Sequence, residues 1–189
     1  MWLSWGIDLL YQIFIMTKKY VLTGSAYSSK TETLKELVKY GFPTVQEAAT
    51  LIISEQLNSG GDLFPWTRLD DFLEVLIEKQ LELESKVHLD SEIAFIDRGI
   101  PDELAYFRYM EIKPTPMYER AFQEHRYDKV FVFDPIPGYK QDKIRREPLE
   151  MVQRLRVLHE EAYRDLDYDV IVVPLMPITE RVNFIIDRI

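Results

Sequence analysis

The stretch between Tyr20 and Leu34 constrains the fold more than any other part of the chain. It reads YVLTGSAYSSKTETL: a short apolar run leads to Gly24, and Lys30 and Thr31 follow where a helical pattern begins. Backbone N–H groups at the start of a helix converge on a phosphate. A lysine at the end of such a loop reaches the outer phosphate oxygens, and the next hydroxyl ligates Mg²⁺. The layout therefore indicates a phosphate-binding loop between a strand and a helix.

The match to the consensus phosphate loop, G-x-x-x-x-G-K-[ST], is incomplete. Gly24, Lys30 and Thr31 fit it, whereas Ser29 occupies the position of the second glycine. A serine-rich turn that caps an ordinary helix is the alternative interpretation of the same stretch. If the loop binds a nucleotide, we expect its phosphate contacts to come from Gly24, Ser25, Ser28, Ser29, Lys30 and Thr31.

Three further apolar runs predict strands that are buried on both faces of a sheet. They are Ile93–Ile96, Val130–Phe133 and Val170–Val173, and none alternates with polar residues. Tyr20–Leu22 and the shorter Phe42–Val45 add two strands, and amphipathic stretches of helical period separate the runs. A chain of 189 residues suits one domain. The pattern predicts a three-layer α/β fold with a mostly parallel five-stranded sheet and helices on both faces.

Charge and cysteine content exclude several classes of protein. The chain has 23 basic and 32 acidic residues, for a net charge of −9, so we expect no broad nucleic-acid-binding face. The sequence contains no cysteine, which rules out disulfides and thiolate zinc sites and is compatible with a cytoplasmic protein. The three histidines are scattered and do not have the spacing of metal ligands.

Residues 1–16 form an apolar extension ahead of the domain predicted for residues 17–189. The first fifteen carry one charge, Asp8. The apolar run is too short to span a bilayer comfortably, and it has neither a basic n-region nor a small-residue cleavage site. Three interpretations remain: a helix docked on the domain, a membrane-surface anchor, or an extension upstream of a natural start at Met16. Membrane contact is expected only through this segment.

Polar residues follow the predicted strand at Ile93–Ile96, at the edge where parallel α/β sheets bind ligands. Asp97 can ligate Mg²⁺ or accept the proton of an attacking hydroxyl; the alternative is a cap for the helix that begins near Pro101. Arg98 can bind a phosphate or acceptor oxygen, or form a structural salt bridge. Asp102 and Glu103 are expected to favour the start of that helix electrostatically.

A basic cluster lies between the last two predicted strands. It comprises Lys140, Lys143, Arg145 and Arg146, and arginines brought in by a closing segment stabilise the transition state of phosphoryl transfer. The alternative is a solvated charged loop. Glu47, at the start of the second predicted helix, can hold an acceptor hydroxyl or complement the helix dipole.

From about Lys18 onward the chain resembles short AAA-domain P-loop ATPases that group with nucleoside- and nucleotide-kinase-like proteins, including ribosylnicotinamide kinase domains. The matching stretches are YVLTG…SKT, VQEAA, EQLNSGGDLFPW, FIDRGIPDELAY, HRYDKVFVF and VVPLMPITERVNFI. The stretch DRG-P-D and HRYDKVF are the most specific of these. Ala26-Tyr27 replaces the usual Pro-Gly pair of the loop, and Thr50 stands where an arginine often follows EAA.

The resemblance implies a P-loop NTPase fold and a role for particular residues. Gly24, Lys30 and Thr31 would bind the nucleotide phosphates, and Asp97, together with Thr31, would serve the metal. The same pattern implies that Arg145 and Arg146 are lid arginines and that Pro174 and Arg181 flank the base. The proposed catalytic set is therefore Asp97, Arg98, Arg145 and Arg146.

Taken together, the sequence predicts a domain that binds ATP or GTP with Mg²⁺. Its reaction would move the γ-phosphoryl group to water or to a small hydroxyl acceptor, by positioning and charge stabilisation. The competing hypothesis is a non-catalytic nucleotide-sensing or interaction module that keeps the fold with an impaired loop. The sequence leaves the acceptor and the oligomeric state open.

Overall fold

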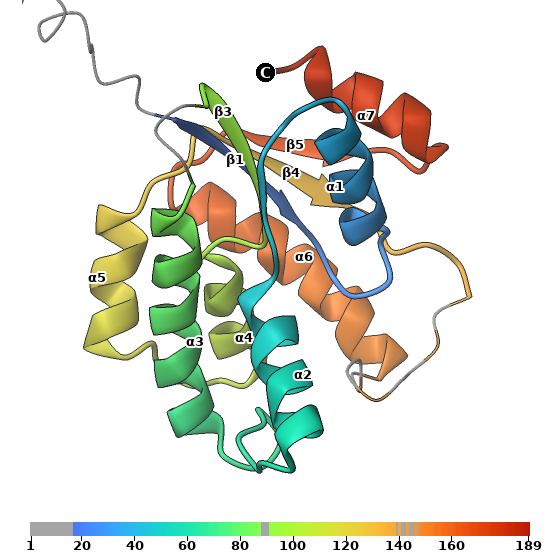
Figure 1. Ribbon diagram of the computed structural model, residues 1–189. Helices are drawn as coiled ribbons and strands as arrows, with labels where there is room; N and C mark the ends of the chain where they lie inside the picture. The colour runs from blue at the N-terminus through green and yellow to red at the C-terminus, as the bar shows by residue number, and fades with distance from the viewer. Residues whose placement is uncertain (1–16, 88–90, 139, 141–142, 144–145, 147) are drawn as a thin grey trace, which may run out of the picture.

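The computed structural model describes residues 17–87, 91–138, 140, 143, 146 and 148–189 (Figure 1). The predicted N-terminal extension at residues 1–16 lies outside the described residues. None of the helices in the described part of the chain is long and apolar enough to cross a membrane.

A five-stranded sheet forms the centre of the molecule, and its strands pair in the order β2-β3-β1-β4-β5. Each pairing is parallel. The predicted α/β class and the parallel five-stranded sheet are therefore confirmed. The strands are β1 (Lys18–Thr23), β2 (Thr44–Val45), β3 (Ile93–Asp97), β4 (Lys129–Phe133) and β5 (Val170–Val173).

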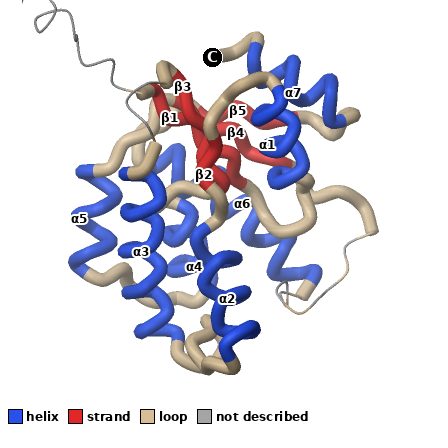
Figure 2. Tube along the Cα trace, viewed as in Figure 1, coloured by secondary structure: helices blue, strands red, loops and turns tan. Residues whose placement is uncertain are grey.

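Helices cover both faces of this sheet, and a group of helices extends beyond it (Figures 1 and 2). In both views α1 and α7 lie together on one side of the strands, while α2, α3, α4 and α5 gather at the other end of the molecule. The helices are α1 (Lys30–Lys39), α2 (Ala48–Ser59), α3 (Leu69–Ser85), α4 (Asp102–Tyr109), α5 (Pro116–Glu124), α6 (Leu149–Asp165) and α7 (Ile178–Ile186).

Successive side chains of a strand point to opposite faces of the sheet, and in these strands both sets of side chains are largely apolar. Tyr20 and Leu22 of β1 pack in a cluster with residues of α1 and α7. Val21, between them, packs in a second cluster with Tyr163 of α6. A third cluster joins α2, α3 and α5. These strands are buried on both faces, as predicted, which explains why their sequences do not alternate with polar residues.

Two helices differ from what the sequence pattern predicts. The helical pattern predicts a helix from Pro65, but α3 begins only at Leu69, because Thr67 Oγ1 donates to the Asp62 carbonyl at 2.6 Å and holds the preceding residues in a turn. The pattern predicts no helix at α5, although Pro116 at its first position is a common helix start.

Sheet register places the polar ends of β1 and β3 side by side. Leu22 pairs with Asp97, so the loop that leaves β1 begins next to the last residue of β3. The Arg98 N–H donates to the Leu22 carbonyl at 3.1 Å and extends this pairing by one residue. Parallel α/β sheets bind ligands at this edge.

Candidate functional site

The loop after β1 begins at a glycine that no other residue can replace without strain. Gly24 has φ +122°, and a Cβ there would lie 2.4 Å from the Phe133 carbonyl oxygen on β4. Only a residue without a side chain lets the loop cross the neighbouring strand this closely. The first glycine of the consensus is thus explained by the sheet itself.

Ser29 occupies the N-cap of α1 in the left-handed region, with φ 61° and ψ 26°. Its carbonyl accepts hydrogen bonds from the N–H and hydroxyl of Thr33, at 3.0 and 2.9 Å. A glycine adopts this conformation freely, whereas a residue with a Cβ is strained in it by about 1–2 kcal/mol. Serine therefore keeps the loop geometry that glycine has in the consensus, at the cost of strain.

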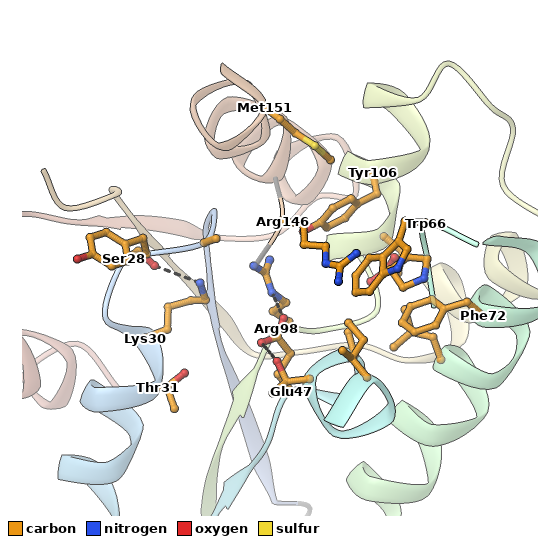
Figure 3. A pocket seen from close by; sticks show the side chains of 18 of the residues that line it. Ser28, Lys30, Thr31, Glu47, Trp66, Phe72, Arg98, Tyr106, Arg146 and Met151 are labelled. Carbon is orange, nitrogen blue, oxygen red and sulfur yellow. Dashed lines mark hydrogen bonds and ion pairs between the residues drawn. The ribbon is translucent and has the colours of Figure 1, made fainter. Parts of the chain in front are cut away.

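Lys30 lies inside the loop (Figure 3). Its side chain is 7% exposed, and Nζ donates to the carbonyls of Gly24 and Ser25 at 3.0 Å each and to Ser28 Oγ at 3.1 Å. Burial, followed by the charge of Arg98, lowers the pKa of Lys30 to about 8. The ammonium is thus held by two carbonyls and a hydroxyl of its own loop. Ser25 is fully buried, and its Oγ has no partner among the described residues.

Thr31 and Asp97 meet across the loop. Thr31 Oγ1 donates to Asp97 Oδ2 at 3.2 Å, while Asp97 Oδ1 is buried without a partner among the described residues. Burial, then the charge of Glu47, raises the pKa of this carboxyl to about 6. A carboxylate with one unsatisfied oxygen beside a hydroxyl fits a hard cation such as Mg²⁺, which takes few protein ligands and shares phosphates and waters. The described residues contain no cluster of three or more His, Cys, Asp or Glu that could hold a metal alone.

Arg98 and Glu47 form an ion pair at the N-terminus of α2 (Figure 3). Arg98 Nε donates to Glu47 Oε1 at 2.6 Å, and Thr50 Oγ1 donates to Glu47 Oε2 at 2.8 Å. Burial alone would raise the pKa of Glu47, but the charges of Arg98 and Lys30 outweigh it and lower that pKa. Glu47 is therefore ionised at neutral pH and lies near both the loop lysine and Arg98.

Asp102 has a role that the sequence did not indicate. Its fully buried carboxylate accepts hydrogen bonds from Thr23 Oγ1 at 2.5 Å, Arg98 NH1 at 3.0 Å and Tyr163 OH at 2.5 Å. It also accepts one from the Gly99 N–H at 3.1 Å. The residue thus links the end of β1, the guanidinium of Arg98 and α6, in addition to beginning α4.

One cavity of about 510 Å³ joins the loop to the helical group. Loop residues from Ala26 to Glu32 line one side, with Glu47 and Arg98 between the two halves. The other half is mostly apolar and aromatic, from the turn before α3, α3 itself, α4 and the start of α6. Its principal residues are Trp66, Leu69, Phe72, Tyr106, Met110 and Met151.

One of the two predicted lid arginines, Arg146, lines this cavity. The guanidinium carbon of Arg146 lies 4.2 Å from the centre of the Trp66 ring, and Arg146 lines the aromatic half of the cavity. Arg145 lies outside the described residues. The remaining basic positions, Lys140 and Lys143, are exposed.

Arg181 does not line the cavity but supports the loop from behind. It is 3% exposed, and NH1 donates to the Ser28 carbonyl at 3.0 Å while NH2 donates to the Met176 carbonyl at 3.4 Å. Pro174, directly after β5, is exposed and lies outside the cavity lining. The structure therefore brings Arg181 to the loop backbone, and its predicted place beside a base stays a prediction.

Glu103 is a second residue that sequence reasoning missed as part of the site. It lines the aromatic half of the cavity, and its carboxyl makes no hydrogen bond or ion pair with any described residue. Burial, then the charge of Asp102, raises the pKa of Glu103 to about 8. The position of Glu103 in the first turn of α4 does not indicate that it lines a cavity, because the cavity forms only when α2 and α3 pack beside α4.

Comparisons with known proteins identify the family and the fold of the chain. A family model described as an AAA domain matches residues 19–181. A comparison with curated protein sequences finds no match. Among solved structures, the NadR protein in complex with NR aligns with a TM-score of 0.70 at 17% identity, over 90% of this chain and 49% of that chain. The chain thus spans about half the length of that NadR protein.

Two kinases align over almost their whole length. Thymidylate kinase from Ehrlichia chaffeensis has a TM-score of 0.61 at 16% identity, over 90% of this chain and 97% of that chain. Deoxyadenosine kinase from M. mycoides with bound dATP has a TM-score of 0.58 at 14% identity, over 90% and 98%. At these identities the likeness establishes the fold, which is that of nucleoside-kinase-like P-loop domains.

Proposed function

The chain belongs to the AAA domain family, and from this premise we propose that it is a phosphotransferase of nucleoside-kinase type. It would transfer the γ-phosphoryl group of ATP or GTP to a hydroxyl of a small acceptor. The observation that carries the proposal is the shared cavity. A phosphate-binding loop and an aromatic pocket open into one space, with the ion pair of Glu47 and Arg98 between them.

The loop side would hold the nucleotide. The start of α1 presents backbone N–H groups to phosphates, and Lys30 would exchange its loop carbonyl contacts for phosphate oxygens. Thr31 and Asp97 would hold Mg²⁺, which neutralises negative charge on the phosphate oxygens during transfer. The buried, unpartnered Oδ1 of Asp97 supports this assignment, because a carboxylate oxygen that has lost water gains most from a cation.

The aromatic side would hold the acceptor. Glu47 is ionised and can accept the hydrogen bond of an attacking hydroxyl, while Arg98 fixes its carboxylate. Apolar and aromatic walls with a few polar groups are typical of sites for small organic ligands. The aligned structures include a thymidylate kinase and a deoxyadenosine kinase, which makes nucleosides and nucleotides the first acceptors to test.

The test is ADP release from purified protein with Mg²⁺ and ATP, with a panel of nucleosides and nucleotides as acceptors. We expect at least one acceptor to raise turnover above the rate with water alone, and chelation of Mg²⁺ to abolish that increase. Phosphorylated acceptor should appear in equal amount to ADP. A rate that no acceptor raises would contradict the kinase proposal.

Ser29 favours a second candidate function, that of a nucleotide-sensing module. A strained loop residue at the helix start can weaken triphosphate binding without preventing it. A sensor would show a nucleotide-induced rise in melting temperature without turnover under any acceptor. The kinase would show both.

A further inference from the structure

Glu103 stands out among the groups that line the cavity, because the phosphoryl-transfer chemistry proposed above does not use it. We propose that Glu103 selects the acceptor by binding a flat ring that presents N–H donors or a positive charge. The contact lies at the end of the acceptor away from the loop. This inference rests on the proposed function for its acceptor, but the binding test below does not depend on turnover.

The position of Glu103 gives it access to a ligand. It lines the main cavity and also a smaller one behind it, which Leu76, Ile77 and Tyr118 border. Its carboxyl makes no hydrogen bond or ion pair with any described residue. Glu103 is half-buried, so its carboxyl is only partly solvated, and a ligand that supplies a donor gains free energy by pairing with it.

The neighbouring charged groups are already satisfied. Asp102 accepts four hydrogen bonds, and Glu47 is bound by Arg98 and Thr50. Arg98 favours the ionised form of Glu103, whereas Asp102 and Glu47 oppose it. Of the carboxylates around the cavity's aromatic half, Glu103 is thus the one left for a ligand within the described part of the chain.

Besides Arg98, Asp102 and Glu47, the side chains that face Glu103 from α3 and α5 are uncharged. From α3, the residues that line the two cavities are apolar apart from Gln80, which donates to Glu84 Oε1 and the Arg98 carbonyl. From α5, Tyr118 faces it, and the Tyr118 hydroxyl donates to the Leu73 carbonyl at 2.8 Å. Arg146 lines the same main cavity.

The aromatic wall favours the same class of ligand. The guanidinium of Arg146, a flat cation, lies over the Trp66 ring, and Phe64 stacks on that ring with centroids 4.9 Å apart and planes at 7°. The face of an aromatic ring attracts flat, electropositive groups. Figure 3 shows Arg146 and Tyr106 beside Trp66. A ligand ring would take the place of the Arg146 guanidinium against Trp66, with its electropositive edge toward Glu103, which lines the same cavity.

The experiment measures binding of matched ligands by calorimetry. Uridine and 3-methyluridine differ at the N3–H donor, and adenosine and purine riboside differ by one amino group. We expect the wild-type protein to bind the donor-bearing member of at least one pair about tenfold to a hundredfold more tightly. In Glu103→Met, which keeps the length of the side chain, this ratio should fall to about one. Glu119→Met, which makes the same change at an exposed glutamate of α5 outside the cavity, serves as the control.

A pH series adds a second measurement, the affinity ratio at each pH, which would not change with pH if Glu103 had only a structural role. A donor-bearing ligand binds the carboxylate, so the affinity ratio within a pair should rise by about tenfold between pH 6.5 and 8.5. Lys30 titrates in the same range, but its effect is common to both members of a pair and cancels in the ratio. In Glu103→Gln the ratio should not change with pH.

Three results would overturn the inference. They are an unchanged ratio in Glu103→Met, a ratio independent of pH in the wild-type protein, and no binding by either member of both pairs. The proposed function is judged separately by ADP release. Turnover only with acceptors that have no N–H donor on the ring would support the kinase function and contradict this role of Glu103. Discrimination within a ligand pair without turnover would support the role of Glu103 and contradict the kinase function.

Discussion

Thr31 Oγ1 donates a hydrogen bond of 3.2 Å to Asp97 Oδ2 and so joins the first turn of α1 to the end of β3. The other oxygen of Asp97 is buried without a partner among the described residues, and the side chain is 3% exposed. This pair combines the hydroxyl and the carboxylate that a magnesium nucleotide requires. The arrangement that would suit a bound magnesium ion therefore leaves one oxygen of the Asp97 carboxylate buried and unpaired when no ligand is present.

Replacement of Asp97 by Asn should lower turnover and raise stability together. A raised carboxyl pKa means that stability is fully present below the unfolded pKa near 4 and is lost as pH rises to about 6. We expect Asp97→Asn to stabilise the empty protein by about 2–3 kcal/mol at pH 7.5, with little difference near pH 4. Urea unfolding at both pH values measures this. Turnover with Mg²⁺ should fall far more than nucleotide binding. An equal loss of both would make Asp97 a general support of the loop.

Lys30→Ala should weaken ATP binding about ten- to a hundredfold, because it removes a charge-assisted contact worth about 1.5–3 kcal/mol. Calorimetric titration gives the affinity. Lys35→Ala is the matched control, since Lys35 is on the same helix but pairs with Glu32 on the exposed side. Equal affinities for wild type and Lys30→Ala would remove the case for a phosphate-binding loop.

Two substitutions at Ser29 separate backbone strain from the hydroxyl. Glycine relieves the left-handed conformation and removes the side chain, whereas alanine keeps the Cβ and removes only the hydroxyl. If strain limits binding, Ser29→Gly should bind ATP several-fold more tightly, and Ser29→Ala should match the wild type. ATP and ADP affinities of the three proteins provide the measurement. Weaker binding by both variants would instead show that the hydroxyl donates to a phosphate.

The buried network around Asp102 should be important for stability. Tyr163→Phe removes the hydroxyl that donates to Asp102 at 2.5 Å and should cost about 1–3 kcal/mol of unfolding free energy. Tyr168→Phe is a matched control, because the hydrogen bond that its hydroxyl donates, to the His125 carbonyl, is long at 3.4 Å. Chemical denaturation compares the two. A loss no larger in Tyr163→Phe than in the control would argue against the network.

The sequence predicted the parts of the molecule whose signals are local. Apolar runs such as Val130–Phe133 became strands because burial on both faces removes polar alternation. Gly24, Lys30 and Asp97 come together because the carboxyl ends of parallel strands share an edge. The start of α3 was placed too early because the side-chain contacts of Thr67, which hold the preceding turn, are not visible in a periodicity.

The roles of Asp102 and Glu103 depend on packing and were not predictable in the same way. Both follow Pro101 in the first turn of α4, where acidic residues are ordinary. Asp102 turns toward Thr23 and α6, whereas Glu103 turns toward the cavity. Neighbours in sequence thus receive different environments from elements far along the chain. No spacing rule distinguishes them.

The contact between Arg181 and the Ser28 carbonyl spans 153 positions of sequence. β1, which leads into the loop, also lies in the middle of the sheet and pairs with β3 and β4, both made later in synthesis. Contacts so far apart in sequence require the closure of a long loop before they form. A growing chain on the ribosome therefore carries the loop long before it has the strands and the helix that shape it. If the loop binds a nucleotide as proposed, that nucleotide would stabilise the fully shaped loop only after α7 has emerged.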